Sequence, residues 1–518
     1  MTHHQKTPTN AAIVGSGVGG LATAIRLAAQ GWEVDVFEAA DGPGGKLREQ
    51  SIDGYRFDLG PSLFTLPELV MELDAMVRER LGPKAAAQLP PFRYQTLDRS
   101  THYFWEDGTR LTAWSDNVRF AEEAAAATGV DAKRVLQHLA ASKRNYEGTR
   151  GVFLTQPLGD VFRKGPKGGW RPLLKALTRL PLVGTLHGLN ARRLKGHPGL
   201  VQLFDRYATY NGSDPFRAPA MLDVIPHLEH GIGTFFPDEG MFGITRHLHR
   251  LAESLGVAFH FREPVARILH AQGAVIGLET AAGNRHLADV VVSNADIHPT
   301  YRKLLPDRPA PERILSQERS TSGLIFYWGV QRSFPELHLH NILFSKDYRE
   351  EFRQIQHHDT PGDDPTVYIN ITSKLRPADA PAGHENWFVL INVGAKPERF
   401  DDPASIDRVR AQVMGKIERT LGLSSGEFQR TLAVERTLTP RDIDERTSSW
   451  RGALYGASSN SPFSAFLRHR NRSKDLKGLY FCGGSVHPGG GIPLCLLSGA
   501  IAAECIADDF QHQQSARA

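Results

Sequence analysis

The chain has 518 residues, of which 41% are hydrophobic and 23% are charged, and its formal net charge is only +4. A chain of this length and composition is globular and divides into about two or three structural units. The nearly balanced charge excludes a protein that binds polyanions over its whole surface, so we expect no nucleic-acid partner. The three cysteines, Cys482, Cys495 and Cys505, lack metal-ligand spacing, so we expect buried thiols and no metal site.

A glycine-rich turn near the N-terminus joins a predicted strand to a predicted helix. The apolar residues 11–14 lead into glycines 15, 17 and 20, which have G-x-G-x-x-G spacing, and a small, apolar helix pattern follows. Gly15 permits the tight turn, Gly17 lets the backbone approach a pyrophosphate, and Gly20 allows helix and strand to pack closely. The free N–H groups at the helix start would face the anion. The motif predicts a dinucleotide site, with a purely structural turn as the alternative.

The residues after this helix favour a dinucleotide that contains adenosine. A second predicted strand, 32–37, ends at Glu38, at the distance of about 20 residues where an acid binds the ribose hydroxyls. Two further glycine-dense loops follow at 41–48 and 54–62. They either bring the backbone close to a flat or anionic ligand or form ordinary turns.

Residues 63–150 are predicted to be mainly helical, with helices over 67–81 and 121–144. The stretches 101–105 and 110–114 flank the sequence Glu-Asp-Gly, which is the pattern of a β-hairpin. This part of the chain therefore combines helices with one pair of strands.

The stretch 161–195 contains nine lysines and arginines, no acidic residue, and leucines between the basic residues. A basic, leucine-rich stretch that also contains Trp170 is typical of an interfacial amphipathic helix on an anionic membrane. The alternative is a solvated helix whose leucines face the core. We expect the anionic membrane surface to be a partner.

Residues 236–300 return to an α/β pattern, in which a helix through Leu255 precedes several strands. The last of these strands, 289–295, is buried and ends in small polar residues. Further strands such as 323–328 and 387–392 predict the sheet of a second domain.

The C-terminal region repeats the order of strand, glycine turn and helix, beginning at Gly478. In one domain with the first turn, it would hold the other half of the same dinucleotide. The apolar stretch 489–507 is interrupted by Gly499 and Glu504, so it predicts a buried helix and not a membrane span. No signal peptide is visible. We therefore expect a cytoplasmic protein that associates peripherally with the membrane.

The chain over nearly its whole length resembles the FAD-dependent carotenoid desaturases of the bacterial phytoene desaturase type, a group within the amine-oxidase-like flavoproteins. The stretch 483–493, Gly-Gly-Ser-Val-His-Pro-Gly-Gly-Gly-Ile-Pro, is close to the signature of that family. Supporting matches lie at 44–46, 58–62, 211–215 and 236–241. Lys46 stands where many relatives carry arginine, and lysine offers a point charge instead of a fork. Within the family, 487–494 and 340–348 look most like hydroxycarotenoid or methoxycarotenoid 3,4-desaturases.

The resemblance implies an α/β fold with a Rossmann-like FAD-binding domain, a mixed-sheet substrate domain and a helical, membrane-associated part. It assigns 1–70, 236–300 and 466–518 to the FAD-binding domain, 71–235 to the helical part, and 301–465 to the substrate domain. It implies that the pyrophosphate contacts are Gly15, Ser16, Gly17, Gly19 and Gly20. The remaining cofactor residues that it implies are Glu38 on the ribose, Lys46 near phosphate or ribose, Gly60 and Ser62 near the flavin, Val265 on the adenine side, and Gly484, Ser485, Gly491 and Ile492 along the isoalloxazine and ribityl groups.

The implied reaction is FAD-dependent C-3,4 desaturation of an acyclic 1-hydroxy- or 1-methoxycarotenoid, a long apolar substrate, with quinone or oxygen as electron acceptor. Asp214 and His487 are the candidate catalytic groups, and each is equally compatible with a structural role. The alternatives are desaturation of phytoene, an amine or protoporphyrinogen oxidase, and a non-enzymatic prenyl-binding relative like the Rab escort and GDP-dissociation inhibitor proteins. Flavin absorbance would exclude the last of these.

Overall fold

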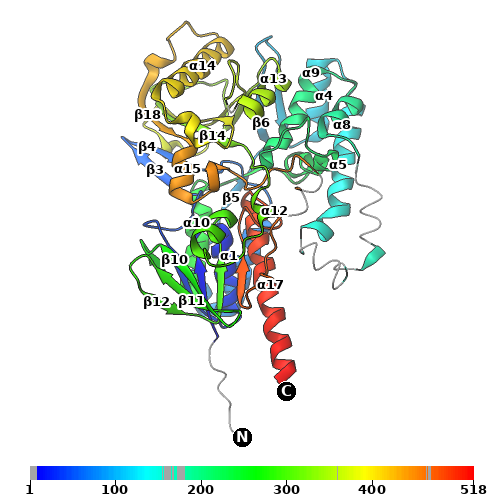
Figure 1. The fold of residues 1–518 in the computed structure, drawn as a ribbon. Helices are drawn as coiled ribbons and strands as arrows, with labels where there is room; N and C mark the ends of the chain where they lie inside the picture. The colour runs from blue at the N-terminus through cyan, green and yellow to red at the C-terminus, as the bar shows by residue number, and fades with distance from the viewer. Residues whose placement is uncertain are drawn as a thin grey trace.

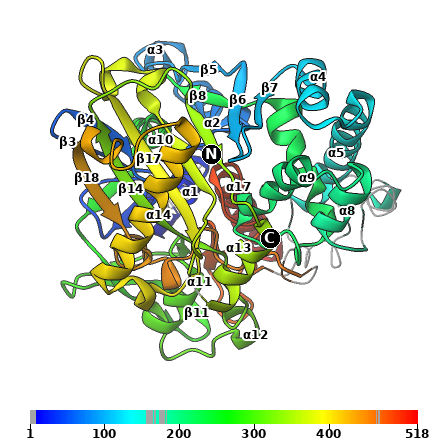
Figure 2. The ribbon, with the colours of Figure 1, turned by 90° about the horizontal axis from the view of Figure 1, so that it is seen from above.

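The computed structural model describes residues 9–517 except 155, 157–164, 166–168, 172–180, 182, 359, 462, 463 and 465–467. Two sheets organise this part of the chain (Figure 1), one in the lower half of the view and one in the upper half. A group of helices stands beside the upper sheet, as the view from above also shows (Figure 2).

The lower sheet is parallel and has five strands in the order β19-β13-β1-β2-β9. Its strands are β1 (Asn10–Val14), β2 (Glu33–Glu38), β9 (Ala258–Phe261), β13 (Val290–Ser293) and β19 (Leu479–Phe481). Ile13 of β1 pairs with Val36 on one side and with Val292 on the other. Three distant parts of the chain therefore end their strands at one edge, which is where parallel α/β sheets bind ligands.

Both faces of the parallel sheet are covered. One face packs against four helices, whose buried apolar residues form one core with β1, β2 and β13. These helices are α1 (Val18–Ala29), α2 (Glu68–Leu81), α10 (Phe242–Ser254) and α17 (Ile492–Arg517). The other face packs against an antiparallel sheet of β10 (Val265–Ala271), β11 (Ala274–Thr280) and β12 (Arg285–Leu287). This arrangement confirms the predicted Rossmann-like α/β unit.

The upper sheet is mixed and has seven strands in the order β18-β14-β17-β16-β15-β6-β7. Its strands are β6 (Arg99–Phe104), β7 (Arg110–Trp114), β14 (Ser322–Val330), β15 (His340–Leu343), β16 (Val367–Asn370), β17 (Glu385–Val393) and β18 (Leu432–Leu438). The predicted hairpin of β6 and β7 is confirmed, and β6 joins the sheet by pairing in parallel with β15. Helix α14 (Pro403–Leu421) packs its apolar residues on this sheet.

The helical group contains α4 (Asn117–Thr128), α5 (Ala132–Phe153), α8 (Leu186–Arg193) and α9 (Pro198–Asp205), followed by the short helices η1 (Arg206–Asn211), η2 (Ala220–Val224) and η3 (Leu228–Ile232). The prediction of one helix over 121–144 is wrong, because α4 ends at Thr128, with Gly129 as its C-cap, and α5 starts after Asp131. Gly129 adopts the left-handed conformation that ends helices, and the Asp131 carboxylate caps α5 by accepting the Lys133 N–H.

The remaining elements are short. They are β3 (Glu49–Ile52), β4 (Tyr55–Asp58), β5 (Tyr94–Thr96), β8 (Phe235–Pro237), α3 (Pro83–Ala86), α11 (Ile297–Pro299), α12 (Glu312–Leu315), α13 (Tyr348–Arg353), α15 (Pro440–Thr447) and the single turns η4 (Thr300–Leu304), η5 (Gln354–His358), η6 (Thr372–Lys374), η7 (Pro377–Asp379), η8 (Pro397–Phe400), η9 (Gln429–Thr431) and η10 (Trp450–Gly452). The predicted helices over 67–81 and through Leu255 are confirmed as α2 and α10.

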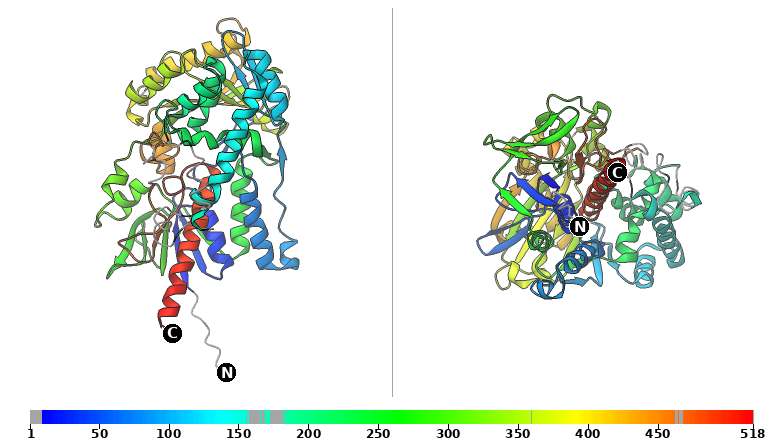
Figure 3. Two further views of the ribbon diagram at one scale, coloured as in Figure 1. Left: turned by 90° about the vertical axis from the view of Figure 1, so that its right-hand side faces the viewer. Right: turned by 90° about the horizontal axis from the view of Figure 1, so that it is seen from below.

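The C-terminal apolar stretch forms α17, which confirms the predicted helix. Figures 1 and 3 show α17 running beside the parallel sheet. Cys482 and Cys505 are buried as predicted, and Cys495 is half-buried. Most of the basic, leucine-rich stretch 161–195 lies outside the described residues. Among the described helices, none is long and apolar enough to cross a bilayer.

Candidate cofactor site

The glycine turn between β1 and α1 has the geometry of an anion site. Gly15 adopts a φ of +93°, and a Cβ atom on Gly20 would lie only 2.2 Å from the Gly15 carbonyl oxygen. The turn therefore needs glycine at both positions, one for its backbone conformation and one for close packing. Helix α1 begins after Gly17 without a side-chain cap, which leaves N–H groups at its start for an anion.

Glu38, at the carboxyl end of β2, lies against this turn. Its Oε2 atom accepts hydrogen bonds from the Ser16 backbone N–H and the Ser16 hydroxyl, each at 2.8 Å. Its Oε1 atom accepts the Ala40 N–H at 2.9 Å. The structure thus brings the predicted ribose ligand and the predicted pyrophosphate turn together at one edge of the sheet.

Asn294, which follows β13, is a site residue that the sequence analysis did not identify. Its Nδ2 atom lies 3.3 Å from the Gly15 carbonyl oxygen, and a Cβ on Gly17 would come within 2.9 Å of the same nitrogen. A Cβ on Gly19 would meet both the Asn294 Oδ1 atom, at 2.8 Å, and the Cα atom of Gly483, at 3.1 Å. The position of Asn294 after a buried parallel strand next to β1 was the available signal.

Residues 15–20, 44–45 and 483–484 together form what we call the glycine cradle. Gly17 forms a bridge with Gly44, and the Gly44 N–H donates to the Ser16 carbonyl at 3.0 Å. A Cβ on Gly484 would be in ordinary contact with Gly490 and Cys495. Three loops that are far apart in the sequence therefore pack backbone against backbone, and this packing fits a cofactor that approaches along main-chain atoms.

Lys46 follows the second loop of the glycine cradle and is half-buried. Its ammonium group donates to the carbonyl oxygens of Ala453, at 3.1 Å, and Leu454, at 2.8 Å. Burial lowers the pKa of Lys46 to about 8, although Asp296 favours the charged form. A Cβ on Gly60 would lie 1.9 Å from the Lys46 carbonyl oxygen, so Gly60 is required for packing against this loop.

Ser62 begins a chain of hydrogen bonds into the upper sheet. Its hydroxyl lies 2.7 Å from the Tyr368 hydroxyl, which in turn lies 2.7 Å from Nδ1 of His340. Burial lowers the pKa of His340 to about 4, so its imidazole is neutral at pH 7. Its Nε2 atom is buried and has no hydrogen-bond partner among the described residues.

Four side chains, Tyr103, Arg206, Tyr210 and Glu229, form a buried polar cluster next to this chain. The Arg206 guanidinium donates to the Glu229 carboxylate at 3.0 Å and to the Tyr103 hydroxyl at 2.6 Å. The Tyr210 hydroxyl donates to the same carboxylate at 2.5 Å. Burial alone would raise the pKa of Glu229, but Arg206 and the hydrogen bonds lower it to about 2. The charges of both ions also act on the pKa of His340, which Glu229 raises and Arg206 lowers.

The C-terminal residues of the predicted site surround the start of α17. A Cβ added to Gly491 would meet no protein atom within 4 Å, so there is open space beside this residue. Ile492 is the first residue of α17 and is buried. The Ser485 hydroxyl is turned toward the protein, where it accepts the Ile297 N–H at 2.9 Å. Val265 begins β10, shortly after Glu263, whose N–H donates to the Glu38 carbonyl at 3.0 Å.

The two candidate catalytic groups lie in different surroundings. The Asp214 carboxylate accepts the Phe216 N–H at 2.8 Å, which is an Asx turn, and burial raises its pKa. His487 lies in the C-terminal loop, where burial lowers its pKa to about 4. Among the described residues, no group of three or more histidines, cysteines and carboxylates could hold a metal ion.

Glycine turns from two distant parts of the chain meet at the carboxyl edge of a parallel sheet, one of them beside the carboxylate of Glu38 and the other before a long helix. This architecture is that of a protein of the FAD-dependent class. The chain belongs to the family described as flavin-containing amine oxidoreductases, which it matches over residues 18–507, and within it to the carotenoid desaturases.

Two relatives and one solved structure show how similar the chain is to known proteins in sequence and in fold. The 1-hydroxycarotenoid 3,4-desaturase of Flavobacterium sp. (strain P99-3) is 47% identical over 498 residues, or 96% of this chain and 98% of that protein. The zeta-carotene-forming phytoene desaturase of Myxococcus xanthus is 32% identical and covers 95% of this chain and 92% of its own length. An oxidoreductase from Methanosarcina mazei shares the fold, with a TM-score of 0.61, 14% identity and coverage of 96% and 100%. The chain is therefore an FAD-dependent oxidoreductase.

Proposed function

We propose that the protein introduces the C-3,4 double bond into an acyclic carotenoid that carries a hydroxyl or methoxy group near one end. The observation that carries this proposal is the 47% identity, over nearly the full length of both chains, to a protein named 1-hydroxycarotenoid 3,4-desaturase. The glycine cradle supports it, because residues near both ends of the chain pack together there as a site that would hold FAD.

In this reaction, bound FAD supplies the acceptor for the hydride that leaves one sp³ carbon, while a proton leaves the neighbouring carbon. The glycine cradle and the start of α1 would hold the pyrophosphate, and Glu38 would hold the ribose. Lys46, whose charge is held by two carbonyl oxygens, would place a cation near the phosphate or ribose. Positive charge that develops next to a polyene is delocalised over it, so the chain needs to position the substrate more than to transfer protons.

Asp214 remains our candidate for the group that accepts the proton. Burial raises the pKa of this carboxyl, as expected for a base that works near neutral pH. If Asp214→Asn turned over at the full rate with an unchanged pH profile, the residue would have no such role. His487, the second candidate, would be tested in the same way with His487→Gln.

The runner-up function is desaturation of phytoene, which the similarity to the Myxococcus xanthus protein favours. Phytoene and a 1-hydroxycarotenoid, each incorporated in liposomes and incubated with the flavin-loaded protein, separate the two. We expect the polyene absorbance to shift to longer wavelength only with the 1-hydroxycarotenoid. A shift with phytoene alone would contradict the proposal and support the runner-up.

A substrate of this kind resides in the bilayer, so we propose that the basic, leucine-rich stretch 161–195 contacts an anionic membrane. Co-sedimentation with anionic liposomes tests this surface. A variant in which the lysines and arginines of the stretch are neutralised should lose binding, and full binding by that variant would overturn the proposal. Quinone or oxygen would reoxidise the flavin.

A further inference from the structure

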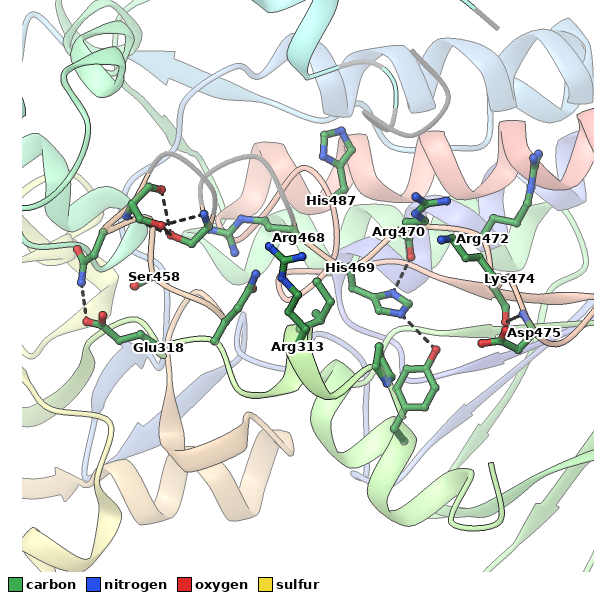
Figure 4. A pocket seen from close by; sticks show the side chains of 18 of the residues that line it. Arg313, Glu318, Ser458, Arg468, His469, Arg470, Arg472, Lys474, Asp475 and His487 are labelled. Atoms are coloured by element: carbon green, nitrogen blue, oxygen red, sulfur yellow. Dashed lines mark hydrogen bonds between the residues drawn. The ribbon is translucent and has the colours of Figure 1, made fainter. Parts of the chain in front are cut away.

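A strongly cationic cavity of about 620 Å³ lies beside the C-terminal glycine loop. Figure 4 shows its lining, which comes largely from described residues of 458–461, from Ser464, from 468–475, from helix α12 and from His487. Six of the lining side chains are arginine or lysine, whereas only Glu318 and Asp475 are acidic. No residue of the glycine cradle is among the described lining residues, so the cavity is distinct from that cradle.

Two of the six cations are already neutralised. Arg217 forms a two-pronged ion pair with Glu318, at 3.0 and 2.7 Å, and Arg472 pairs with Asp509 at 2.9 Å. The other four are Arg313, Arg468, Arg470 and Lys474. In the described part of the chain, none of these four forms an ion pair, and neither does Asp475. The cavity therefore carries an excess of positive charge.

Arg468 is the most informative of these cations because it is only 8% exposed. Its guanidinium donates to the Tyr455 carbonyl at 3.2 Å and to the Ser459 hydroxyl at 3.3 Å, which are both neutral acceptors. Burial lowers its pKa to about 10. A buried charge without a counter-ion is costly, and an anion in the cavity would remove that cost.

His487 provides a second unsatisfied polar group on the same cavity wall. Its side chain is 7% exposed, and its Nε2 atom has no hydrogen-bond partner among the described residues. A neutral imidazole has one N–H group, and one ring nitrogen of His487 already bonds to the Gln156 backbone, so Nε2 would donate to a bound anion in the imidazolium form, which the anion favours. Arg470 and Lys474 are exposed at the rim, where they would attract an anion from solution.

We propose that this cavity binds a phosphate group, held by Arg468 and His487 inside and by Arg313, Arg470 and Lys474 at the rim. Arginine forks match the oxygens of phosphate, and a charge-assisted set of donors binds it well. The proposed substrate is an uncharged polyene with one terminal hydroxyl or methoxy oxygen, so it would leave most of these donors unpaired and their positive charge uncompensated. The phosphate group would come either from a phospholipid headgroup or from a soluble phosphate.

Titration calorimetry of the flavin-loaded protein with inorganic phosphate, at constant ionic strength, tests the proposal. The variants are Arg470→Gln and Lys474→Gln at the rim, and the matched control is Arg80→Gln at the end of α2, which is exposed and does not line the cavity. Because a hydrogen bond to a charged group is worth about 1.5–3 kcal/mol, we expect each rim variant to bind phosphate about tenfold more weakly. The control should match the wild type.

Absence of phosphate binding to the wild type, or equal binding by the wild type and both rim variants, would overturn the proposal. Unfolding midpoints equal to that of the wild type establish that the variants fold. Co-sedimentation with phosphatidylcholine vesicles, with and without phosphatidylglycerol, identifies the source of the phosphate. A selective loss of phosphatidylglycerol binding in Arg470→Gln supports a lipid headgroup. Unchanged vesicle binding together with weaker binding of inorganic phosphate supports a soluble phosphate.

Discussion

The glycine cradle and the buried polar cluster differ in the atoms that make their contacts. In the glycine cradle the contacts are between main-chain atoms, and added Cβ atoms at Gly19 and Gly20 would collide with their neighbours. In the cluster, the contacts are between long charged and aromatic side chains such as Arg206 and Glu229. The first region depends on the absence of side chains, and the second on hydrogen bonds and an ion pair between buried polar side chains.

This difference separates the roles of the two regions. A cradle of backbone groups suits a cofactor shared by many enzymes, because main-chain N–H groups recognise its phosphates without help from side chains. The polar cluster includes Tyr103 of the upper sheet, and the charges of its Glu229 and Arg206 act on His340, which ends the chain of hydrogen bonds from Ser62 through Tyr368. The following variants test whether the two regions respond to substitution as differently as their construction implies.

The largest effect is expected for Glu229→Gln. This substitution leaves the Arg206 guanidinium buried without its counter-ion, so we expect the free energy of unfolding to fall by about 3–5 kcal/mol. Denaturant titration measures it. The control is Glu350→Gln, which breaks the exposed pair with Arg353 and should barely change stability. A loss as small as that of the control would show that the cluster does not depend on its ion pair.

Gly20→Ala should damage the glycine cradle. The new Cβ would lie 2.2 Å from the Gly15 carbonyl oxygen, so the turn must shift, at a cost of about 1–3 kcal/mol. We also expect the purified variant to lose the visible absorbance of bound flavin. Gly42→Ala in the next loop, where an added Cβ meets no atom closer than 3.9 Å, should keep it. Retention of flavin by Gly20→Ala would contradict the close packing.

The stability of the protein should fall with acidity in a window set by buried histidines. For His340 the pKa is about 4 in the folded protein and about 6.5 in an unfolded chain. The unfolded state therefore binds more protons between these values, and stability is lost as the pH falls from 6.5 toward 4. In His340→Gln the loss between pH 7 and 4.5 should be smaller by about 2 kcal/mol. An identical pH dependence of the two proteins would contradict the buried, neutral imidazole.

A smaller effect is expected for Glu38→Gln, which keeps the shape of the side chain but removes its charge. A ribose hydroxyl donates more weakly to an amide than to a carboxylate, so we expect FAD to bind about tenfold more weakly. Quenching of flavin fluorescence during titration of the apoprotein measures the affinity. Glu33→Gln, at the exposed opposite end of the same strand β2, should bind FAD as the wild type does. Equal FAD affinities of Glu38→Gln and the wild type would show that Glu38 does not bind the cofactor.

The two regions also differ in how far the sequence predicts them. The glycine cradle is predictable because each glycine is required by local geometry, and strands such as β1, β2 and β13 follow from short apolar runs. The polar cluster is not, because Tyr103 and Glu229 lie far apart in the chain and only the pairing of β6 with β15 places β6 in the upper sheet. The sequence does not single out Asn294, because an asparagine after a strand is common. It does not predict the break between α4 and α5, because the apolar pattern continues across Gly129.

The central claim is that the glycine cradle holds FAD for the desaturation of a hydroxylated carotenoid. The most direct measurement mixes the purified, flavin-loaded protein with a 1-hydroxycarotenoid in liposomes under anaerobic conditions and follows the visible flavin absorbance. We predict that the flavin bleaches while one equivalent of a carotenoid with one additional conjugated double bond is formed. An oxidised flavin and an unchanged carotenoid after full binding of the substrate would contradict the account.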